Sequence, residues 1–167
     1  MKKILFATIM IIGALSHSFA QSASGKFSIG VEAGLPVGSA SDISNFAIGG
    51  SLKYELPVAT STFVSLSGGY TDLLYKSDIK AESGSSGEGF IPVKAGLKYY
   101  FNQGFYGEGQ LGAAFSTQSG DSGAAFIYAP GFGYSFNGGF DAGFRYEGWS
   151  KDGGTVSQLA LRIAYRF

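Results

Sequence analysis

Apolar and polar residues alternate along much of this chain, and the alternation is most regular in the last ten residues. There, polar or small positions separate five large apolar ones: Leu159, Leu161, Ile163, Tyr165 and Phe167. A period of two is typical of a β-strand with one apolar and one polar face. Because the apolar face continues unbroken to the last residue, the pattern favours a strand facing lipid in a membrane barrel over the last strand of a soluble β-domain.

The same pattern predicts eight strands, each about as long as a tilted strand that crosses a bilayer. The predicted strands are residues 26–35, 46–56, 62–71, 90–101, 105–116, 124–136, 139–148 and 156–167. No long amphipathic helical pattern lies between them. We therefore predict an all-β fold, namely an eight-stranded antiparallel up-and-down transmembrane β-barrel.

The predicted connectors alternate in character along the chain. The second, fourth and sixth are short (residues 57–61, 102–104 and 137–138), and Asn137-Gly138 is a strong tight-turn signal. The other connectors are longer or more polar, and residues 72–89 form the longest. Outer-membrane barrels have short periplasmic turns and longer outer loops. We therefore expect both chain ends in the periplasm and the long connectors outside the cell.

Volume indicates which face of the strands lies inside the barrel. The interior of an eight-stranded barrel holds only side chains or one small ligand. The apolar face carries bulky Phe, Tyr, Leu and Ile residues, whereas the other face is mostly Gly, Ala and Ser with isolated charges. We therefore place the apolar face on lipid, which argues against a soluble lipocalin-like binder. The aromatic residues fall into two groups at the strand ends, as expected for interfacial girdles.

Two prolines do not fit this pattern well. Pro130 lies inside a predicted strand, where a proline removes one donor from the ladder of hydrogen bonds. Because a closed barrel has no edge strand, we expect a bulge at residues 129–131. Pro92 raises the same question at the start of the fourth strand.

The first 20 residues have the pattern of a secretory signal peptide. Lys2 and Lys3 precede an apolar run from Ile4 to Leu15, and residues 18–20 form a small-x-small cleavage site. The run is too short for a transmembrane anchor. We predict a signal peptide at residues 1–20 and a barrel domain at residues 21–167. With no Cys in the chain, a Cys-acylated lipoprotein and disulfides are excluded.

Charge gives no reason to expect a nucleic-acid partner. Removing Lys2 and Lys3 leaves ten basic residues against 12 acidic ones, a net charge of −2. The 27 Gly residues are more informative, because glycine in strands marks tight curvature or close backbone approach.

Eleven charged residues alternate onto the face that we place inside the barrel. They are Glu32, Lys53, Glu55, Lys94, Lys98, Glu108, Asp141, Arg145, Glu147, Arg162 and Arg166. Strand neighbourhood predicts that Asp141 lies near Arg166, and that Arg145 and Glu147 lie near Arg162. Carboxylates beside bases permit acid–base catalysis. The favoured interpretation is a set of paired structural charges that plugs the lumen, because buried charges must be paired.

The residue types that are missing argue against an enzyme. The only His is His17, within the predicted signal peptide, so the mature chain has neither His nor Cys and cannot form a Ser-His-Asp site. No zinc-like spacing occurs. The acidic residues Asp72, Asp78, Glu82 and Glu88 of the longest connector are either calcium ligands or, as is more common, solvated loop charges. We predict no cofactor and no metal.

Two segments resemble a known class of proteins. Phe90-Ile91-Pro92-Val93-Lys94-Ala95-Gly96-Leu97-Lys98-Tyr99-Tyr100-Phe101 and Phe105-Tyr106-Gly107-Glu108-Gly109-Gln110-Leu111-Gly112 resemble small outer-membrane β-barrel proteins of Gram-negative bacteria, the OmpA/OmpX-like class in its Bacteroidota branch. The resemblance covers residues 25 to 167 and implies the fold. It is a poor guide to function, since the class includes adhesins, structural proteins, immune-evasion factors and enzymes. Barrel enzymes of this class that rely on His are excluded by its absence.

From these observations we predict a non-enzymatic integral outer-membrane protein with a plugged polar lumen. Its outer loops would serve surface interaction or envelope stability, and we expect a monomer. The alternative is a small-solute pore or a carrier of an apolar ligand. The ending also resembles the C-terminal signature that the barrel-assembly machinery recognises, which implies Tyr165 and Phe167 as an assembly signal.

Overall fold

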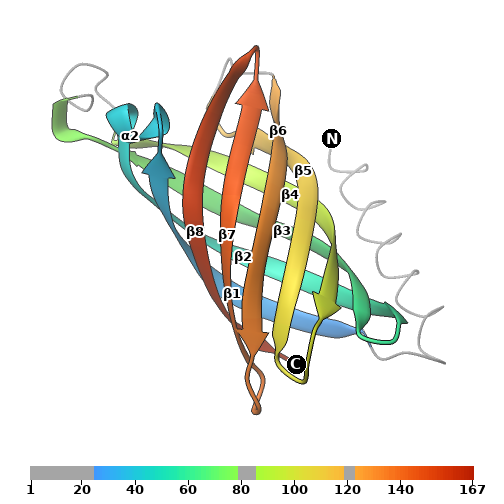
Figure 1. Ribbon diagram of the computed structural model, residues 1–167. Coiled ribbons are helices and arrows are strands. Elements are labelled where there is room, and N and C mark those ends of the chain that lie inside the picture. Colours follow the sequence, from blue (N-terminus) through green and yellow to red (C-terminus); the bar gives the residue numbers. More distant parts are fainter. Residues whose placement is uncertain (1–24, 79–85, 119–122) are drawn as a thin grey trace, which may run out of the picture.

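The computed structural model describes residues 25–78, 86–118 and 123–167 (Figure 1). Within them, eight strands form a closed barrel in which each strand is antiparallel to its neighbours in sequence and β8 returns to pair with β1. The elements are β1 (Lys26–Val37), α2 (Ala40–Ile43), β2 (Ser44–Ala59), β3 (Thr62–Tyr75), β4 (Gly87–Tyr100), β5 (Phe105–Ser116), β6 (Ala124–Ser135), β7 (Phe140–Lys151) and β8 (Gly154–Arg166). The predicted eight-stranded up-and-down barrel is confirmed. The predicted signal peptide lies outside the described residues.

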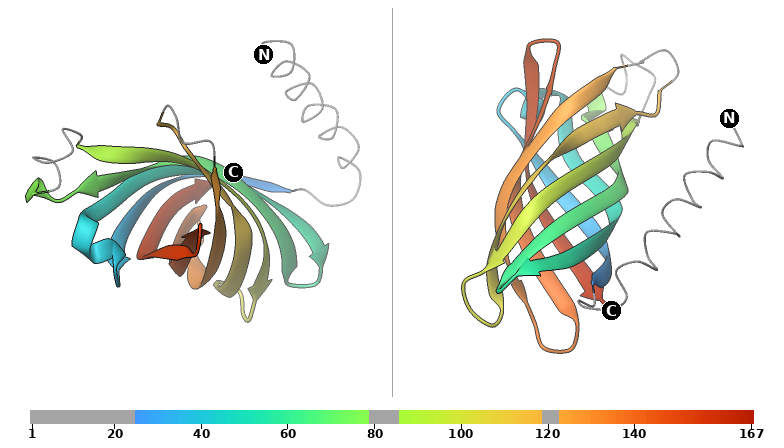
Figure 2. Two further views of the ribbon diagram at one scale, coloured as in Figure 1. Left: turned by 90° about the horizontal axis from the view of Figure 1, so that it is seen from above. Right: turned by 90° about the vertical axis from the view of Figure 1, so that its right-hand side faces the viewer.

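The strands are long, strongly tilted and staggered, as the two views of Figure 2 show. We call the end that holds the β2–β3, β4–β5 and β6–β7 connections the turn end, and the opposite end the loop end. The first and last strands close the barrel in register, with Ile29 opposite Tyr165 and Val31 opposite Ile163. The amide of Phe167 donates a hydrogen bond to the carbonyl of Phe27, at 2.8 Å. Apolar residues of β1 thus lie opposite apolar residues of β8, and the exposed apolar face continues across this seam.

Burial confirms the assignment of the two faces. The large apolar side chains predicted to face lipid are exposed on the barrel exterior, and Val31 (67%) and Leu97 (60%) are examples. Charged residues on the opposite face are buried, and Lys98 is 0% exposed. An exterior of this kind requires an apolar solvent, because a strand face rich in Leu, Ile and Phe is not stable in water.

Three connectors at the loop end differ from expectation. The connector predicted at residues 72–89 is shorter, since β3 continues to Tyr75 and β4 begins at Gly87. The connector before the last strand is a two-residue turn at Asp152 and Gly153, which have φ angles of 50° and 82°. Two successive positive φ angles match the twist of a tight hairpin, and Asp-Gly is a preferred sequence for it. The first connector contains the single-turn helix α2.

The expected bulge at Pro130 is wrong. Tyr128 lies opposite Gly148, and Gly131 lies opposite Arg145, so the β6–β7 register is the same on both sides of the proline. Within this stretch of the β6–β7 ladder, residues 129 and 130 are the ones without a β7 partner. The ladder thus tolerates a lost donor without inserting a residue, and the register shifts that do occur lie in β2, between Ser44 and Phe46 and between Pro57 and Ala59.

Candidate functional site

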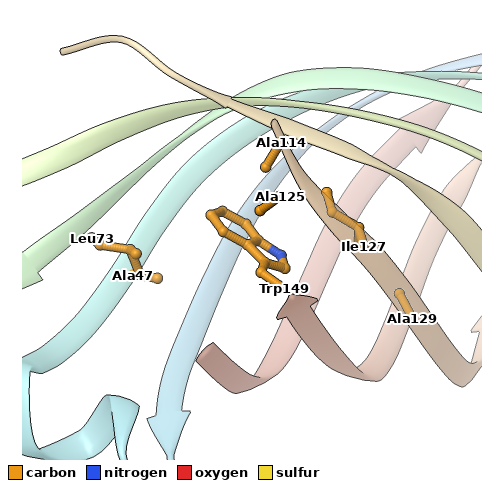
Figure 3. Packing of buried hydrophobic residues seen from close by; sticks show 7 residues of the cluster. All are labelled: Ala47, Leu73, Ala114, Ala125, Ile127, Ala129 and Trp149. Carbon is orange, nitrogen blue, oxygen red and sulfur yellow. The ribbon is translucent and has the colours of Figure 1, made fainter. Parts of the chain in front are cut away.

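The barrel interior divides into two layers of different chemistry. We call the first the charged layer; it occupies the middle of the barrel and its turn-end side. Its members are Glu32, Lys53, Glu55, Lys94, Lys98, Glu108, Asp141, Arg145, Glu147 and Arg162. We call the second the apolar layer; it lies towards the loop end (Figure 3). Its members are Ala47, Leu73, Ala114, Ala125, Ile127, Ala129 and Trp149.

Lys98 on β4 is the centre of the charged layer at the turn end. Its Nζ lies 2.8 Å from a carboxylate oxygen of Glu55 on β2 and 3.3 Å from one of Asp141 on β7. The same Nζ lies 3.7 Å from the centroid of the Tyr106 ring, a cation–π distance. One fully buried ammonium group therefore connects three strands that do not pair with one another.

Two further lysines also reach across the lumen. Lys53 on β2 pairs with Glu108 on β5 at 2.6 Å, and the hydroxyl of Ser65 donates to the same carboxylate at 2.6 Å. Lys94 on β4 pairs with Glu147 on β7 at 2.8 Å. Both pairs are at most about one-tenth exposed, so each ion is held by its partner rather than by bulk water.

Arginines connect the charged layer to the β1–β8 seam. Arg145 on β7 donates to Glu147 on its own strand at 2.6 Å and also to Glu32 on β1. Arg162 on β8 lies opposite Glu32 in the ladder, with a nitrogen–oxygen distance of 3.5 Å. Arg162 also donates to the hydroxyl of Ser51 at 2.9 Å, and that hydroxyl donates to Glu32.

The residues predicted to lie near one another do not form direct ion pairs. Asp141 accepts hydrogen bonds from Tyr106 and Ser135, and Arg166 donates to Ser135 and Tyr100, so a hydroxyl separates Asp141 from Arg166. Likewise, Arg145 and Glu147 bind other partners than Arg162. The prediction considered only adjacent strands, whereas lysine and arginine side chains are long enough to cross this narrow interior.

Little space remains within the charged layer. A cavity of about 20 Å³ lies among Lys53, Glu108, Arg145 and Arg162, which is close to the minimum that holds one water molecule. Three buried side-chain atoms of the described residues have no hydrogen-bond partner in the protein: Oε2 of Glu55, Oγ of Ser67 and Oε1 of Gln158. Apart from Oε2 of Glu55, the carboxylate oxygens of the charged layer are bound by bases or by hydroxyl and indole donors.

Trp149 was not among the predicted interior residues, because the seventh strand was predicted to end at residue 148. Tyr106, Ser65 and Ser135, which donate to the buried carboxylates, were not predicted either. The Trp149 indole lies among Ala114, Ala125 and Ile127 in Figure 3 and is 5% exposed. Its Nε1–H donates to Glu147 at 2.7 Å, so it joins the apolar layer to the charged layer. The available signal was the alternation itself, which continues from Arg145 through Glu147 to Trp149.

The predicted assembly residues lie on the exterior at the turn end. Tyr165 and Phe167 are 43% and 71% exposed, and their ring centroids are 5.3 Å apart. Tyr165 also contacts Phe140 edge-on at 5.5 Å. Similar ring contacts follow this end of the barrel from Tyr99 through Phe101 to Phe105 and between Tyr134 and Phe136. The turn-end aromatic group thus contains several runs of rings in contact.

Neither a metal-binding cluster nor a membrane-spanning helix occurs in the described ranges. No group of three His, Cys, Asp or Glu side chains there is arranged to hold a metal ion, and Glu82, one of the four acidic residues considered for calcium, lies outside those ranges. No helix of residues 25–78, 86–118 and 123–167 has the length and hydropathy of a membrane span.

No family model and no curated protein matches this sequence. Solved structures do match. The crystal structure of Ail, the attachment invasion locus protein of Yersinia pestis, is 21% identical, covers 88% of this chain and 100% of its own, and has a TM-score of 0.60. The N-terminal β-barrel domain of Pseudomonas aeruginosa OprF is 15% identical over 87% of this chain and 100% of its own, with a TM-score of 0.58.

The outer-membrane enzyme PagL is 14% identical, covers 83% of this chain and 98% of its own, and has a TM-score of 0.55. At these identities the likeness concerns the fold, which is that of small Gram-negative outer-membrane β-barrels. The predicted fold and outer-membrane setting agree with these neighbours. Because one fold here includes both an attachment protein and an enzyme, function must be argued from the residues of this chain.

Proposed function

We propose that this chain is a non-enzymatic, monomeric integral protein of the outer membrane whose lumen is closed and whose loop end serves surface interaction or envelope stability. The observation that carries the proposal is the combination of an apolar exterior with an interior filled by crossing ion pairs. Lys98, Lys53 and Lys94 each pair with a carboxylate on a distant strand. Such an interior stabilises a barrel and leaves no continuous water path.

Chemistry at the carboxylates is disfavoured by what surrounds them. A general acid or base must reach a substrate within hydrogen-bond distance. Glu147 is held by Lys94, Arg145 and the indole of Trp149, and Glu108 is held by Lys53 and Ser65. With His and Cys missing from residues 21–167, the residue types that most often act as base or nucleophile are not available either.

Planar-bilayer recording tests the closed lumen against the alternative of a small-solute pore. We expect the purified protein to insert without a stable, large open conductance. As a positive control, the triple variant Lys53→Ala, Lys94→Ala and Arg145→Ala removes three of the crossing side chains and should raise the conductance if it folds. A stable large conductance of the unmodified protein would reject the closed lumen.

Protease accessibility tests which end faces outward. The proposal places the connector between β3 and β4 outside the cell and the chain ends in the periplasm, as the alternation of turns and loops suggests. A protease site introduced at Ser85 should be cleaved in intact cells. The matched control is a site at Gln103 in the β4–β5 turn, which should be cleaved only after the outer membrane is permeabilised. The reverse result would invert the proposed orientation.

We further propose that Tyr165 and Phe167 form the signal by which the assembly machinery recognises the last strand. Both rings are exposed at the turn end and are thus accessible to another protein before lipid surrounds them.

A further inference from the structure

A second interior space lies at the loop end, on the far side of the apolar layer from the charges. Its volume is about 160 Å³. Leu73, Phe90 and Trp149 line it from the barrel wall, while Ile43 of α2 and Val156 of β8 line it nearer the rim. Ile43 and Val156 are 47% and 40% exposed, whereas Leu73 and Trp149 are buried. The space is therefore a pocket that is closed below and reached from the loop end.

The size and lining of this pocket suit one small apolar group. An apolar cavity of about 150 Å³ is large enough to bind benzene. The Phe90 and Trp149 rings meet edge-on, with centroids 5.0 Å apart and an interplanar angle of 71°. Such a pair presents an aromatic face and an aromatic edge to a third ring. The pocket would thus accept a single ring or a branched alkyl group of similar size.

One charged side chain lines the pocket, and it is acidic. The Glu88 carboxylate accepts hydrogen bonds from the hydroxyls of Tyr75, at 3.1 Å, and Ser116, at 2.8 Å. Among the described residues it forms no ion pair, unlike the carboxylates of the charged layer. A carboxylate that is held in place by two hydroxyls and lies beside an apolar pocket attracts a cation that brings its own apolar group.

We propose that this pocket binds a small amine whose apolar body, one aromatic ring in size, occupies the space against Phe90 and Trp149 and whose ammonium group binds Glu88. Burial of the ring supplies affinity, and the ammonium–carboxylate bond supplies the preference for a cation. The proposal goes beyond the closed lumen and the outer loops, since the pocket lies above the apolar layer and needs no path through the barrel.

Trp149 is the only Trp of the chain, so its fluorescence reports directly on the pocket. The protein is reconstituted in nanodiscs of zwitterionic phosphatidylcholine, which do not themselves concentrate cations by surface charge. Phenethylamine and 3-phenylpropionate, which carry the same ring with opposite charges, are titrated while Trp149 is excited at its red edge. We expect a saturable change with phenethylamine and binding at least about tenfold weaker for 3-phenylpropionate.

Three variants decide the outcome. Glu88→Gln keeps a hydrogen-bond acceptor but removes the charge and should abolish the preference for the amine. Val156→Phe fills the pocket and should weaken binding of the amine at least about tenfold. Asp152→Asn changes an acidic residue of the β7–β8 turn that does not line the pocket, and it should leave binding within about twofold.

Linear, unsaturable responses would show only partition into lipid and would overturn the proposal. So would equal binding of the two probes, or a preference that survives in Glu88→Gln. None of these results bears on the conductance measurement, so failure of the pocket and failure of the closed lumen are distinguishable.

Discussion

The two layers of the interior are held together in different ways. In the charged layer, Lys98 and its two carboxylate partners meet from three strands, and the geometry is set by ion pairs. In the apolar layer, Trp149 and Ile127 pack among alanines, and the geometry is set by shape. Removing one partner from the first layer strongly destabilises the fold, because a buried charge is then left unpaired. Truncating side chains of the second layer lowers the free energy of unfolding in proportion to the volume lost.

The partners of the carboxylates also differ along the barrel. In the charged layer, bases, hydroxyls and the indole of Trp149 hold every carboxylate oxygen except Oε2 of Glu55. On the loop-end side of the apolar layer, the Glu88 carboxylate accepts hydrogen bonds from the hydroxyls of Tyr75 and Ser116. The two chemistries are therefore separated along the barrel axis, with ion pairs nearer the turn end and apolar side chains nearer the loop end.

The largest effect is expected at Lys98. Lys98→Met keeps most of the volume but leaves Glu55 and Asp141 buried without their base, and we expect a loss of about 4–5 kcal/mol in the free energy of unfolding. Urea titration of protein refolded in detergent measures it. Lys76→Met, in the residue that follows β3 and lies outside the charged layer, is the matched control. Equal stability of the two variants would contradict the role given to crossing ion pairs.

A smaller loss is expected at Arg145. Its partners retain other bases, since Glu147 keeps Lys94 and Glu32 keeps Arg162. Arg145→Ala should therefore cost about 3 kcal/mol, at the lower end of the range for a broken buried pair. The same urea titration checks the order of the two variants. If Arg145→Ala is the more destabilising, the centre of the charged layer lies nearer to the β1–β8 seam than to Lys98.

At the boundary between the layers, Trp149→Phe keeps an aromatic ring but loses the hydrogen bond to Glu147. We expect a cost of about 1–2 kcal/mol, since a bond to a charged acceptor is involved. Trp149→Leu removes more volume as well and should cost more. Equal stabilities of Trp149→Phe and the unmodified protein would indicate that the indole fills space only.

The smallest effect on folded stability is expected on the exterior of the turn end, where many rings share the interface. Deletion of Phe167 and the substitution Phe136→Ala should each change the unfolding free energy only modestly in detergent. In cells, deletion of Phe167 should lower the amount of inserted barrel far more than Phe136→Ala does. Equal insertion of the two variants would remove the basis for a terminal assembly signal.

Much of the fold followed from local alternation. The eight strands, the exposed face and the inward position of residues such as Lys53 and Lys98 depend only on the period of two within each strand. The ends of the strands were harder, because the ladder continued past Asp72 and past Gly148 wherever a partner strand was available. Asp152-Gly153 is a preferred sequence for a tight hairpin turn, but this connector was predicted only to be longer or more polar.

The sequence predicts which charged residues face the interior, but it does not predict which of them pair. Alternation places Lys98, Glu55 and Asp141 inside, but their meeting depends on barrel diameter and stagger, which no local pattern contains. The pocket at the loop end was not anticipated for a related reason. Its lining comes from the ends of several strands and from α2, a single turn that has no helical period of its own.

The β1–β8 seam has a consequence for the order of folding. Ser28 lies opposite Arg166, so closure joins residues from opposite ends of the chain, and contacts so distant in sequence form slowly. Until the seam closes, Glu32 and Arg162 remain in contact with water, and their desolvation and mutual pairing must therefore accompany closure. We expect the amide of Phe167, which bonds to Phe27, to gain protection after those of the central hairpins in a pulse-labelled hydrogen-exchange refolding experiment. Closure of the seam would then be the last step of folding, and the hydrogen bonds and charges of the seam would become inaccessible to water at the same time.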